Sequence, residues 1–226
     1  MVQDKKLAII VPCYNEINTI IETYNKIKIH GVPIIVDDCS DDGTREILVS
    51  KKIKFIKNKV RSGYEKTIIN GFHYINKNLP KVDFVATIDA DLELPPKHLL
   101  KLYKSAKKHN CDIMIGSRKK LNRIAENILS FFFRSLFDID DPISGLKIYK
   151  KIKIKKILNK ISNNFFLVDI LIISLNKKYL INSQKISIRK RKDLPRVGSS
   201  LRVNLKILKI LIYSLVKKKY YDEGLR

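Results

Sequence analysis

Two pairs of carboxylates follow short apolar runs of this 226-residue chain. Asp89 and Asp91 come directly after one run, and Asp37 and Asp38 come directly after another. Carboxylates that converge in one cleft repel each other and lose hydration, and a bound divalent cation removes both penalties. Oxygen ligands of this kind suit Mg²⁺ or Mn²⁺, which also binds substrate phosphates. The pattern predicts a metal and phosphate site; a solvated turn, or helix capping by Asp37 or Asp38, is the alternative.

These acidic pairs can meet only if the runs before them lie side by side in a sheet. Strands are expected at 7–11, 32–36, 52–56, 82–88 and 113–115, and helices at 15–28, 44–50, 62–77 and 95–109. This alternation is typical of a parallel, doubly wound α/β sheet, which binds ligands at the carboxyl ends of its strands. The spacing of Ser62 and Glu65 predicts a capping box. Later strands are expected at 145–149 and 179–188, and helices at 122–137, 152–161, 165–175 and 201–220.

Three segments of the first half resemble the motifs of family 2 glycosyltransferases. They are VPCYNE at 11–16, VDDCSDDGT at 36–44 and DADLELPP at 89–96. The resemblance implies the glycosyltransferase A fold, a Rossmann-like α/β fold with a mostly parallel central sheet and helices on both faces. It also implies a nucleotide-sugar donor, a GDP- or UDP-hexose, together with Mg²⁺ or Mn²⁺.

Segments of the second half resemble dolichol-phosphate mannosyltransferases and related polyprenyl-phosphate glycosyltransferases. These segments are GSR at 116–118, DPISGLKIY at 141–149 and RVGSS at 196–200, and the stretch 58–71 resembles a glycine-bearing helix start near the donor. The resemblance covers about residues 6–205 and implies inverting, metal-dependent transfer of a hexose to a polyprenyl phosphate. The alternative is a family 2 enzyme that acts on a hydroxyl of a glycan or lipid-linked saccharide in cell-surface polysaccharide synthesis.

The resemblance also implies roles for individual side chains. The donor would be bound by Pro12, Tyr14, Glu16, Asp37, Asp38, Gly63, Asp89 and Ala90. The metal would be held by Asp89 and Asp91, with Glu93 as a third ligand. The catalytic residues would be Asp91, Arg118, Ser144 and Asp141. The acceptor phosphate would be bound by Arg118, Arg123, Arg134, Ser144, Arg196 and Arg202, for which a solvated basic face is the alternative.

Four positions depart from the family pattern. Glu93 replaces the usual Gln, Leu146 replaces Phe, Ser199 replaces Glu, and Leu201 stands where Lys is usual. These changes make the identity of the acceptor less certain than the identity of the donor class. A hydroxyl acceptor needs a general base, whereas a lipid phosphate is already anionic at pH 7. Asp141 is therefore either a base for a hydroxyl acceptor or a residue that holds the acceptor loop.

The net charge of +24 is distributed unevenly along the chain. Residues 1–115 contain 19 basic and 14 acidic side chains, whereas residues 116–226 contain 27 and 8. A lipid phosphate and an anionic membrane surface are the expected partners of this basic half, and a lysine-rich composition is the plainer explanation. No nucleic acid is expected as a partner, because the carboxylates at two strand ends would repel its phosphates and no interleaved basic and aromatic pattern is present.

The segment 201–220 predicts an amphipathic helix. Arg202, Lys206 and Lys209 fall near one face, and most of the remaining circumference is apolar. The charges oppose a membrane span, so we expect a helix that lies in the membrane interface, with packing on the core as the alternative. Asp169, inside an apolar helix, is expected to pair with an arginine.

The expected organisation is one glycosyltransferase domain at 1–200, followed by a C-terminal amphipathic helix at 201–226. The domain would have a donor half at 1–118 and an acceptor half at 119–200. Three cysteines in this length exclude a disulfide scaffold, and the chain has no run of 18 apolar residues. We expect a cytoplasmic protein that is peripheral on the inner face of the cell membrane.

Overall fold

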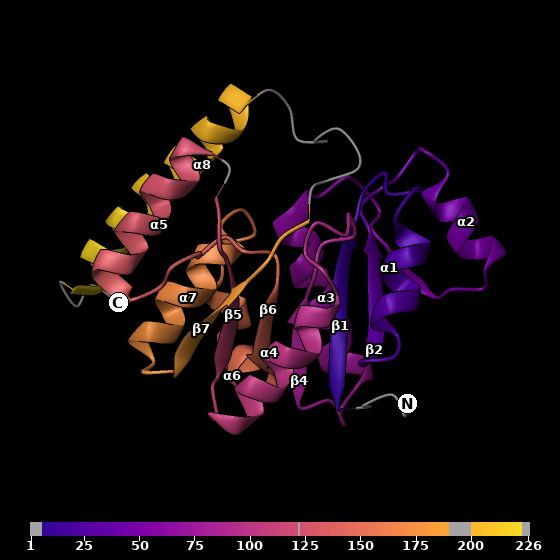
Figure 1. Ribbon diagram of the computed structural model, residues 1–226, viewed down its shortest axis with the longest axis horizontal. Helices are drawn as coiled ribbons and strands as arrows, with labels where there is room; N and C mark the ends of the chain where they lie inside the picture. The colour runs from indigo at the N-terminus through magenta and orange to yellow at the C-terminus, as the bar shows by residue number, and fades with distance from the viewer. Residues whose placement is uncertain (1–5, 122, 190–199, 223–226) are drawn as a thin grey trace.

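A seven-stranded sheet forms the centre of the computed structural model, which describes residues 6–121, 123–189 and 200–222 (Figure 1). The strands are β1 (Leu7–Cys13), β2 (Val32–Asp37), β3 (Phe55–Lys57), β4 (Phe84–Thr87), β5 (Ile113–Arg118), β6 (Lys147–Lys150) and β7 (Ile181–Ile186). Their order is β3-β2-β1-β4-β6-β5-β7. Strand β6 runs antiparallel to β4 and β5, and the other neighbours are parallel. The mostly parallel sheet expected from the sequence is confirmed.

Helices cover both faces of this sheet (Figure 1). They are α1 (Ile20–Ile27), α2 (Thr44–Ser50), α3 (Tyr64–Asn78), α4 (Lys97–Lys108), α5 (Ile124–Phe137), α6 (Lys151–Ile157), the 3₁₀ helix η1 (Leu158–Lys160), α7 (Phe166–Asn176) and α8 (Ser200–Asp222). Side chains of β1 alternate between two apolar cores, because successive residues of a strand point to opposite faces. Ile10 packs in the core with α3, α5 and α7, and Ile9 packs in the core with α1 and α4.

Two local predictions are wrong. The first helix begins at Ile20 rather than near Asn15, because residues 16–19 form a turn in which the Thr19 N–H bonds to the Glu16 carbonyl. The capping box at the start of α3 does not form, and Gly63 occupies the N-cap position without a side-chain cap. The Asp38 carboxylate instead takes the backbone N–H groups of residues 62 and 63.

Helix α8 packs against α5 and α7. Ile207, Ile210 and Ser214 are its buried contacts. The Lys217 ammonium pairs with the buried carboxylate of Asp169 at 2.7 Å, so the expected arginine partner of Asp169 is a lysine of α8. Together these contacts place α8 on the body of the domain. Every helix in the described ranges is too short or too polar to span a bilayer.

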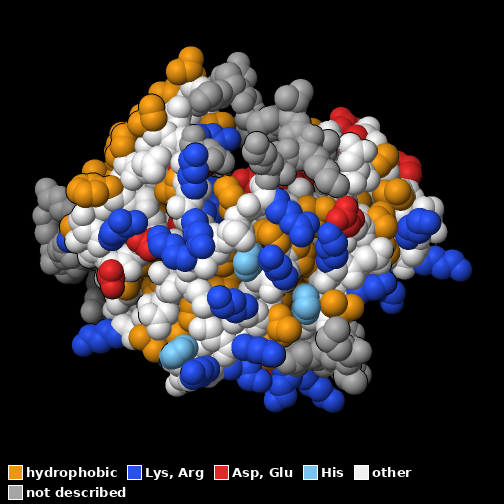
Figure 2. Space-filling model, viewed as in Figure 1, with side chains coloured by type: hydrophobic (Ala, Val, Ile, Leu, Met, Phe, Trp, Pro, Cys, Tyr) orange, Lys and Arg blue, Asp and Glu red, His pale blue; other side chains and the backbone are white. Residues whose placement is uncertain are grey.

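Apolar side chains stay exposed on the outer sides of α5 and α8. In Figure 2 they run along the edge of the molecule that these two helices form. They recur at steps of four and three residues, so each set lies on one side of its helix. We call this surface the α5–α8 face; it comprises Ile124, Ile128 and Phe131 of α5 and Leu201, Leu205, Leu208, Ile212 and Leu215 of α8.

Candidate active site

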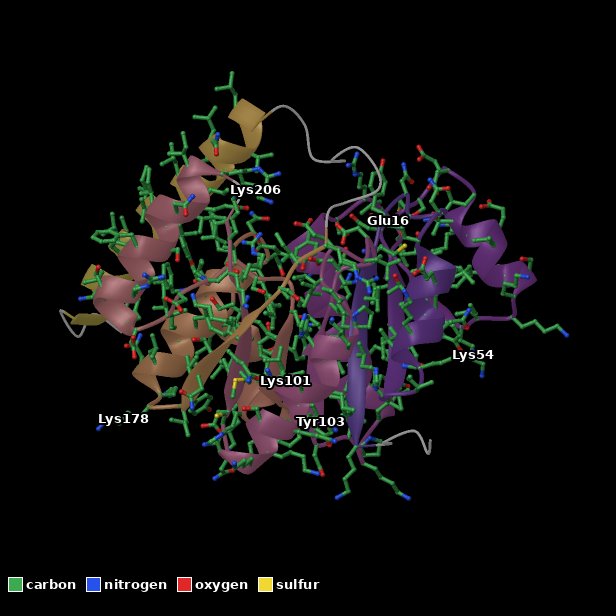
Figure 3. All side chains as sticks on the ribbon, in the orientation of Figure 1. Glu16, Lys54, Lys101, Tyr103, Lys178 and Lys206 are labelled. Atoms are coloured by element: carbon green, nitrogen blue, oxygen red, sulfur yellow. The ribbon has the colours of Figure 1, made fainter. Side chains whose placement is uncertain are left out.

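A cavity of about 410 Å³ opens at the carboxyl ends of the central strands. Its lining comes from the ends of β1, β4 and β5, from the start of α3, and from α5, α7 and α8. Figure 3 shows Glu16 and Lys206, which both line it, on opposite sides of this end of the sheet. The position is the one that a parallel sheet predicts for a ligand site.

Three carboxylates that follow β4 line the cavity, those of Asp89, Asp91 and Glu93. The Tyr64 hydroxyl donates to Asp89 Oδ1 at 2.7 Å, and the Glu93 N–H donates to Asp91 Oδ1 at 3.0 Å. The pKa of Asp89 is raised to about 7, first by burial and next by the charge of Asp91. This repulsion is what a divalent cation would relieve, so the donor set fits the expected metal.

In the described part of the chain, no three His, Cys, Asp or Glu side chains converge closely enough to form a metal site by themselves. Mg²⁺ sites in enzymes are commonly built from one or two carboxylates together with substrate phosphates and water. Asp89 and Asp91 are the carboxylates that would hold the cation here, with Glu93 beside them.

Most of the residues expected to bind the donor line the cavity. Those at the ends of β1 and β2 and at the start of α3 form what we call its donor end: Pro12, Tyr14, Glu16, Asp38 and Gly63. Ala90, which follows β4, lines the cavity beside them. Asp38 accepts hydrogen bonds from Asn58 Nδ2 at 2.8 Å and from the N–H groups of Ser62 and Gly63 at 2.7 and 2.8 Å. A carboxylate offers about four acceptor positions, so most of its capacity serves to hold this loop.

Asp37 differs from its neighbour, because its side chain does not line the cavity. It is fully buried at the end of β2, where it pairs with Arg45 and accepts from the Ser40 N–H at 3.3 Å. The structure therefore places Asp37 behind the cavity wall, where it supports the 40–45 turn.

Arg118 reaches the opposite end of the cavity, and Asp141 determines its orientation. The Arg118 guanidinium donates to both Asp141 oxygens, at 2.8 and 3.0 Å, and its backbone N–H donates to Oδ2 at 3.0 Å. Arg123 also lines the cavity, and Glu126 pairs with it at 3.0 Å and with Arg118 at 3.6 Å. The two guanidinium groups are thus held side by side by carboxylates.

Asp141 and Ser144 do not line the cavity, although both were expected to be catalytic. The Ser144 hydroxyl is fully buried and donates to the Gly116 carbonyl at 2.6 Å. Both side chains therefore contact the strand that carries Arg118, and neither lines the cavity in this structure. In this position Asp141 holds Arg118. This agrees with the interpretation of Asp141 as a positioning residue and not with that of a general base.

The remaining expected acceptor residues lie elsewhere. Arg134 pairs with Asp140 beside a separate, smaller pocket of about 180 Å³, so it does not belong to the main cavity. Arg196 and the segment 196–199 lie outside the described residues. The backbone of Arg202 lies in the first turn of α8, but its side chain is outside the described part of the chain.

Among the charged residues and tyrosines that line the cavity, five were not anticipated from the sequence: Arg61, Tyr64, Glu65, Glu126 and Lys206. The Arg61 guanidinium stacks over the Tyr14 ring at 4.0 Å from its centroid. Glu126 could have been found from its position three residues after Arg123 on one helix, and Tyr64 from its place directly after Gly63. Glu65 and Lys206 carry no comparable signal, since their place at the cavity depends on how α8 packs against α5 and α7.

Glu65 is a buried carboxylate at the α7 side of the cavity. It accepts from the Leu167 N–H at 3.4 Å, in the first turn of α7. Burial raises the pKa of Glu65 to about 7, against the opposing charges of Lys206 and Lys147. Burial also lowers the pKa of Lys147 to about 7, and the Lys147 ammonium donates to the Ser144 carbonyl at 2.6 Å.

Relatives of known sequence support the expected family. A dolichol-phosphate mannosyltransferase of Pyrococcus furiosus is 29% identical over 171 residues, which cover 65% of this chain and 46% of that protein. An undecaprenyl-phosphate 4-deoxy-4-formamido-L-arabinose transferase of Photorhabdus laumondii is 28% identical over 131 residues. These residues cover 52% of this chain and 38% of that protein. An uncharacterised protein of Methanocaldococcus jannaschii is 25% identical over 199 residues, 81% of either chain. The chain thus spans less than half the length of the two named transferases.

The fold agrees with that of solved glycosyltransferases. The glucosyl-3-phosphoglycerate synthase of Mycobacterium tuberculosis, in complex with Mn²⁺, UDP-glucose and glycerol 3-phosphate, superposes with a TM-score of 0.73. The superposition covers 95% of this chain and 80% of that chain at 15% identity, and it confirms the glycosyltransferase A fold. Residues 8–128, more than half of the chain, match the sequence profile of Glycosyl transferase family 2. The chain belongs to this family and is a glycosyltransferase.

Proposed function

We propose that this glycosyltransferase transfers a hexose from a GDP- or UDP-sugar to a polyprenyl phosphate, with inversion and with a divalent metal ion. The main support for this proposal is the set of residues that line one cavity. Its donor end holds Tyr14 and Asp38, its middle holds the acidic residues, and its far end combines arginines with apolar side chains. An anion with a hydrocarbon tail fits that far end, and two relatives are named for polyprenyl-phosphate substrates.

In a single in-line displacement, the residues of this chain would position the metal ligands and bind the acceptor phosphate. Tyr64 holds Asp89 by its hydrogen bond, and Asp141 aims the Arg118 guanidinium at the cavity. Arg118 and Arg123 would bind the acceptor phosphate, whose oxygen is already a nucleophile and needs no base. The cation, when bound, neutralises charge on the departing nucleoside diphosphate.

A second acceptor class is supported by one residue. Glu65 is a carboxylate in the cavity with a pKa near 7, which suits a general base for a sugar hydroxyl. An acceptor of this class would be a glycan or a lipid-linked saccharide.

We also propose that the protein is peripheral on the cytoplasmic, inner face of the cell membrane. The exposed α5–α8 face offers apolar contact, and residues 116–226 carry 27 basic against 8 acidic side chains. Such a combination suits an anionic lipid surface.

A transfer assay tests the enzymatic proposal. GDP- and UDP-hexoses labelled in the sugar are incubated with a polyprenyl phosphate, or with free and lipid-linked saccharides, in Mg²⁺, in Mn²⁺ or in chelator. Label in the lipid phosphate that requires a metal supports the proposal. Label only in a saccharide moves the assignment to the hydroxyl acceptor, and transfer that is unaffected by chelator contradicts the metal requirement.

A further inference from the structure

Helix α8 forms one wall of the acceptor end of the cavity. Val203, Lys206, Ile207 and Ile210 line it, and their spacing of three and four residues puts them on one side of the helix. Figure 3 shows Lys206 on α8, across the end of the sheet from Glu16. The helix therefore contributes three apolar side chains and one cation to the site.

The position of this wall is fixed by contacts further along α8. Lys217 pairs with Asp169 of α7 at 2.7 Å, and the Tyr213 ring stacks on Phe165 with centroids 4.0 Å apart. Ile207 and Ile210 are buried in the same core as α5 and α7. Lys206 is consequently held at the cavity by a packed helix.

The three cations of the acceptor end differ in how their charge is balanced. Arg118 is paired with Asp141 and Glu126, and Arg123 is paired with Glu126. Lys206 acts on Glu65, the buried carboxylate that also accepts the Leu167 N–H. Because burial favours the protonated form of Glu65, this carboxylate balances Lys206 only in part at neutral pH.

The cavity that Lys206 lines has an apolar component. Ile143 and Leu167 line it together with the three apolar residues of α8. A saccharide would place hydroxyls against this wall, whereas an amphiphile would place a phosphate at the cations and hydrocarbon against the isoleucines and leucine.

We propose that Lys206 is an acceptor-specificity residue that binds the phosphate of a prenyl-phosphate acceptor and exchanges its attraction to Glu65 for that phosphate. This inference rests on the proposed polyprenyl-phosphate acceptor and assigns a residue to it. The first isoprene unit of the acceptor then lies on the wall formed by Ile207 and Ile210.

The test compares Lys206→Gln with Lys209→Gln in the full chain. Lys209 is an exposed lysine on the same helix that does not line the cavity, so both changes remove one charge from α8. Binding of a short, soluble prenyl phosphate is measured by calorimetry, and the acceptor and donor KM values are measured by transfer. We expect Lys206→Gln to weaken prenyl-phosphate binding roughly ten- to a hundredfold, since a hydrogen bond to a charged group is lost. Lys206→Arg should restore most of the binding.

The control Lys209→Gln should stay within about twofold of wild type in both measurements, because Lys209 does not line the cavity and charges at a distance are screened by salt. Glu65→Gln keeps an acceptor for the Leu167 N–H but removes the competing charge, and it should tighten prenyl-phosphate binding. If the two lysine variants weaken binding equally, or if Glu65→Gln weakens it as Lys206→Gln does, the inference is overturned.

These measurements separate the inference from the proposed function. Specific weakening by Lys206→Gln in an enzyme that binds prenyl phosphate but glycosylates only saccharides would support the Lys206 site and refute the proposed acceptor. Transfer to lipid phosphate with an unchanged acceptor KM in Lys206→Gln would support the proposed acceptor and refute the Lys206 site. Failure of the wild type to bind prenyl phosphate would overturn both.

Discussion

Gly145 lies directly against the carboxylate of Asp89. A β-carbon at Gly145 would stand 2.2 Å from Asp89 Oδ2 and 2.6 Å from Oδ1, closer than any real contact. The approach arises because β6 enters the sheet antiparallel beside β4, and the Thr87 hydroxyl bonds to the Gly145 carbonyl at 2.8 Å. The glycine thus gives Asp89 the room it occupies at the centre of the cavity.

Substitution of this glycine should disable the site. In Gly145→Ala the added methyl group must push the Asp89 carboxylate aside, and a displacement of this kind lowers transfer roughly a hundredfold. Single-turnover rates and nucleotide-sugar binding check this expectation, with Asp89→Asn as the comparison. A thermal unfolding scan confirms that the variant is folded. Wild-type transfer by folded Gly145→Ala would show that Asp89 does not need this position.

The role of Asp141 as a support for Arg118 can be tested against its neighbour. Asp141→Asn removes the charge and one arm of the paired contact to Arg118, so kcat/KM for the acceptor should fall roughly tenfold or more. Asp140→Asn breaks pairs with the more exposed Arg134 and Lys185, and exposed pairs contribute little. Equal losses in the two variants would contradict a specific role for Asp141.

The effect of a divalent metal on nucleotide-sugar binding should require the Asp91 carboxylate. Nucleotide-sugar affinity of the wild type should increase with Mn²⁺ or Mg²⁺, and Asp91→Asn should lose that increase, a difference of roughly tenfold or more. Asp83→Asn is the matched control, because Asp83 lies before the amino end of β4 and pairs with Lys6 at the opposite end of the strand. Calorimetric titrations with and without chelator provide the measurement. Identical metal responses in Asp91→Asn and wild type would exclude Asp91 as a ligand.

The pH dependence of stability should report on Glu65. Its pKa is raised from 4.5 to about 7 in the folded protein, chiefly by burial, so the folded state binds this proton more tightly than the unfolded chain. The stabilisation is complete below about pH 4.5 and is lost as the pH rises through 7. Relative to wild type, Glu65→Gln should gain roughly 2 kcal/mol in free energy of unfolding between pH 5 and pH 8.

Urea unfolding at the two pH values measures this change. Glu46→Gln, which alters an exposed glutamate of α2, is the control and should follow the pH profile of the wild type. A parallel profile for Glu65→Gln would show that Glu65 is already ionised throughout this range.

Membrane attachment should depend on the α5–α8 face. Replacing Phe131 and Ile212 by serine removes two exposed apolar side chains, one from each helix, and should reduce flotation with anionic vesicles roughly tenfold or more. Val49→Ser is the control, because Val49 is equally exposed but lies on α2. Flotation that is unchanged in the double variant, or equally reduced in Val49→Ser, would place the lipid contact elsewhere or nowhere.

Local sequence patterns determine the strands, one of the helices and the family of this protein. Apolar runs that end in carboxylates set the strands and placed Asp89 and Asp91 at one edge of the sheet, because strand periodicity and turn chemistry act over a few residues. The same applies to α2, which spans 44–50 as expected, and to the family, which short motifs identify.

Only the tertiary structure decided which of these residues face the cavity. Asp37 and Asp38 are adjacent, yet one pairs with Arg45 behind the site and the other lines it. Ser144 turned inward to Gly116, and the expected cap of α3 was displaced by Asp38, more than twenty residues earlier. Lys206 acts on Glu65 because α8 packs against α5 and α7, and Glu65 accepts from the backbone of α7. Contacts between distant residues depend on packing and burial, whose energies no local pattern contains, and they decided the acceptor end of the site.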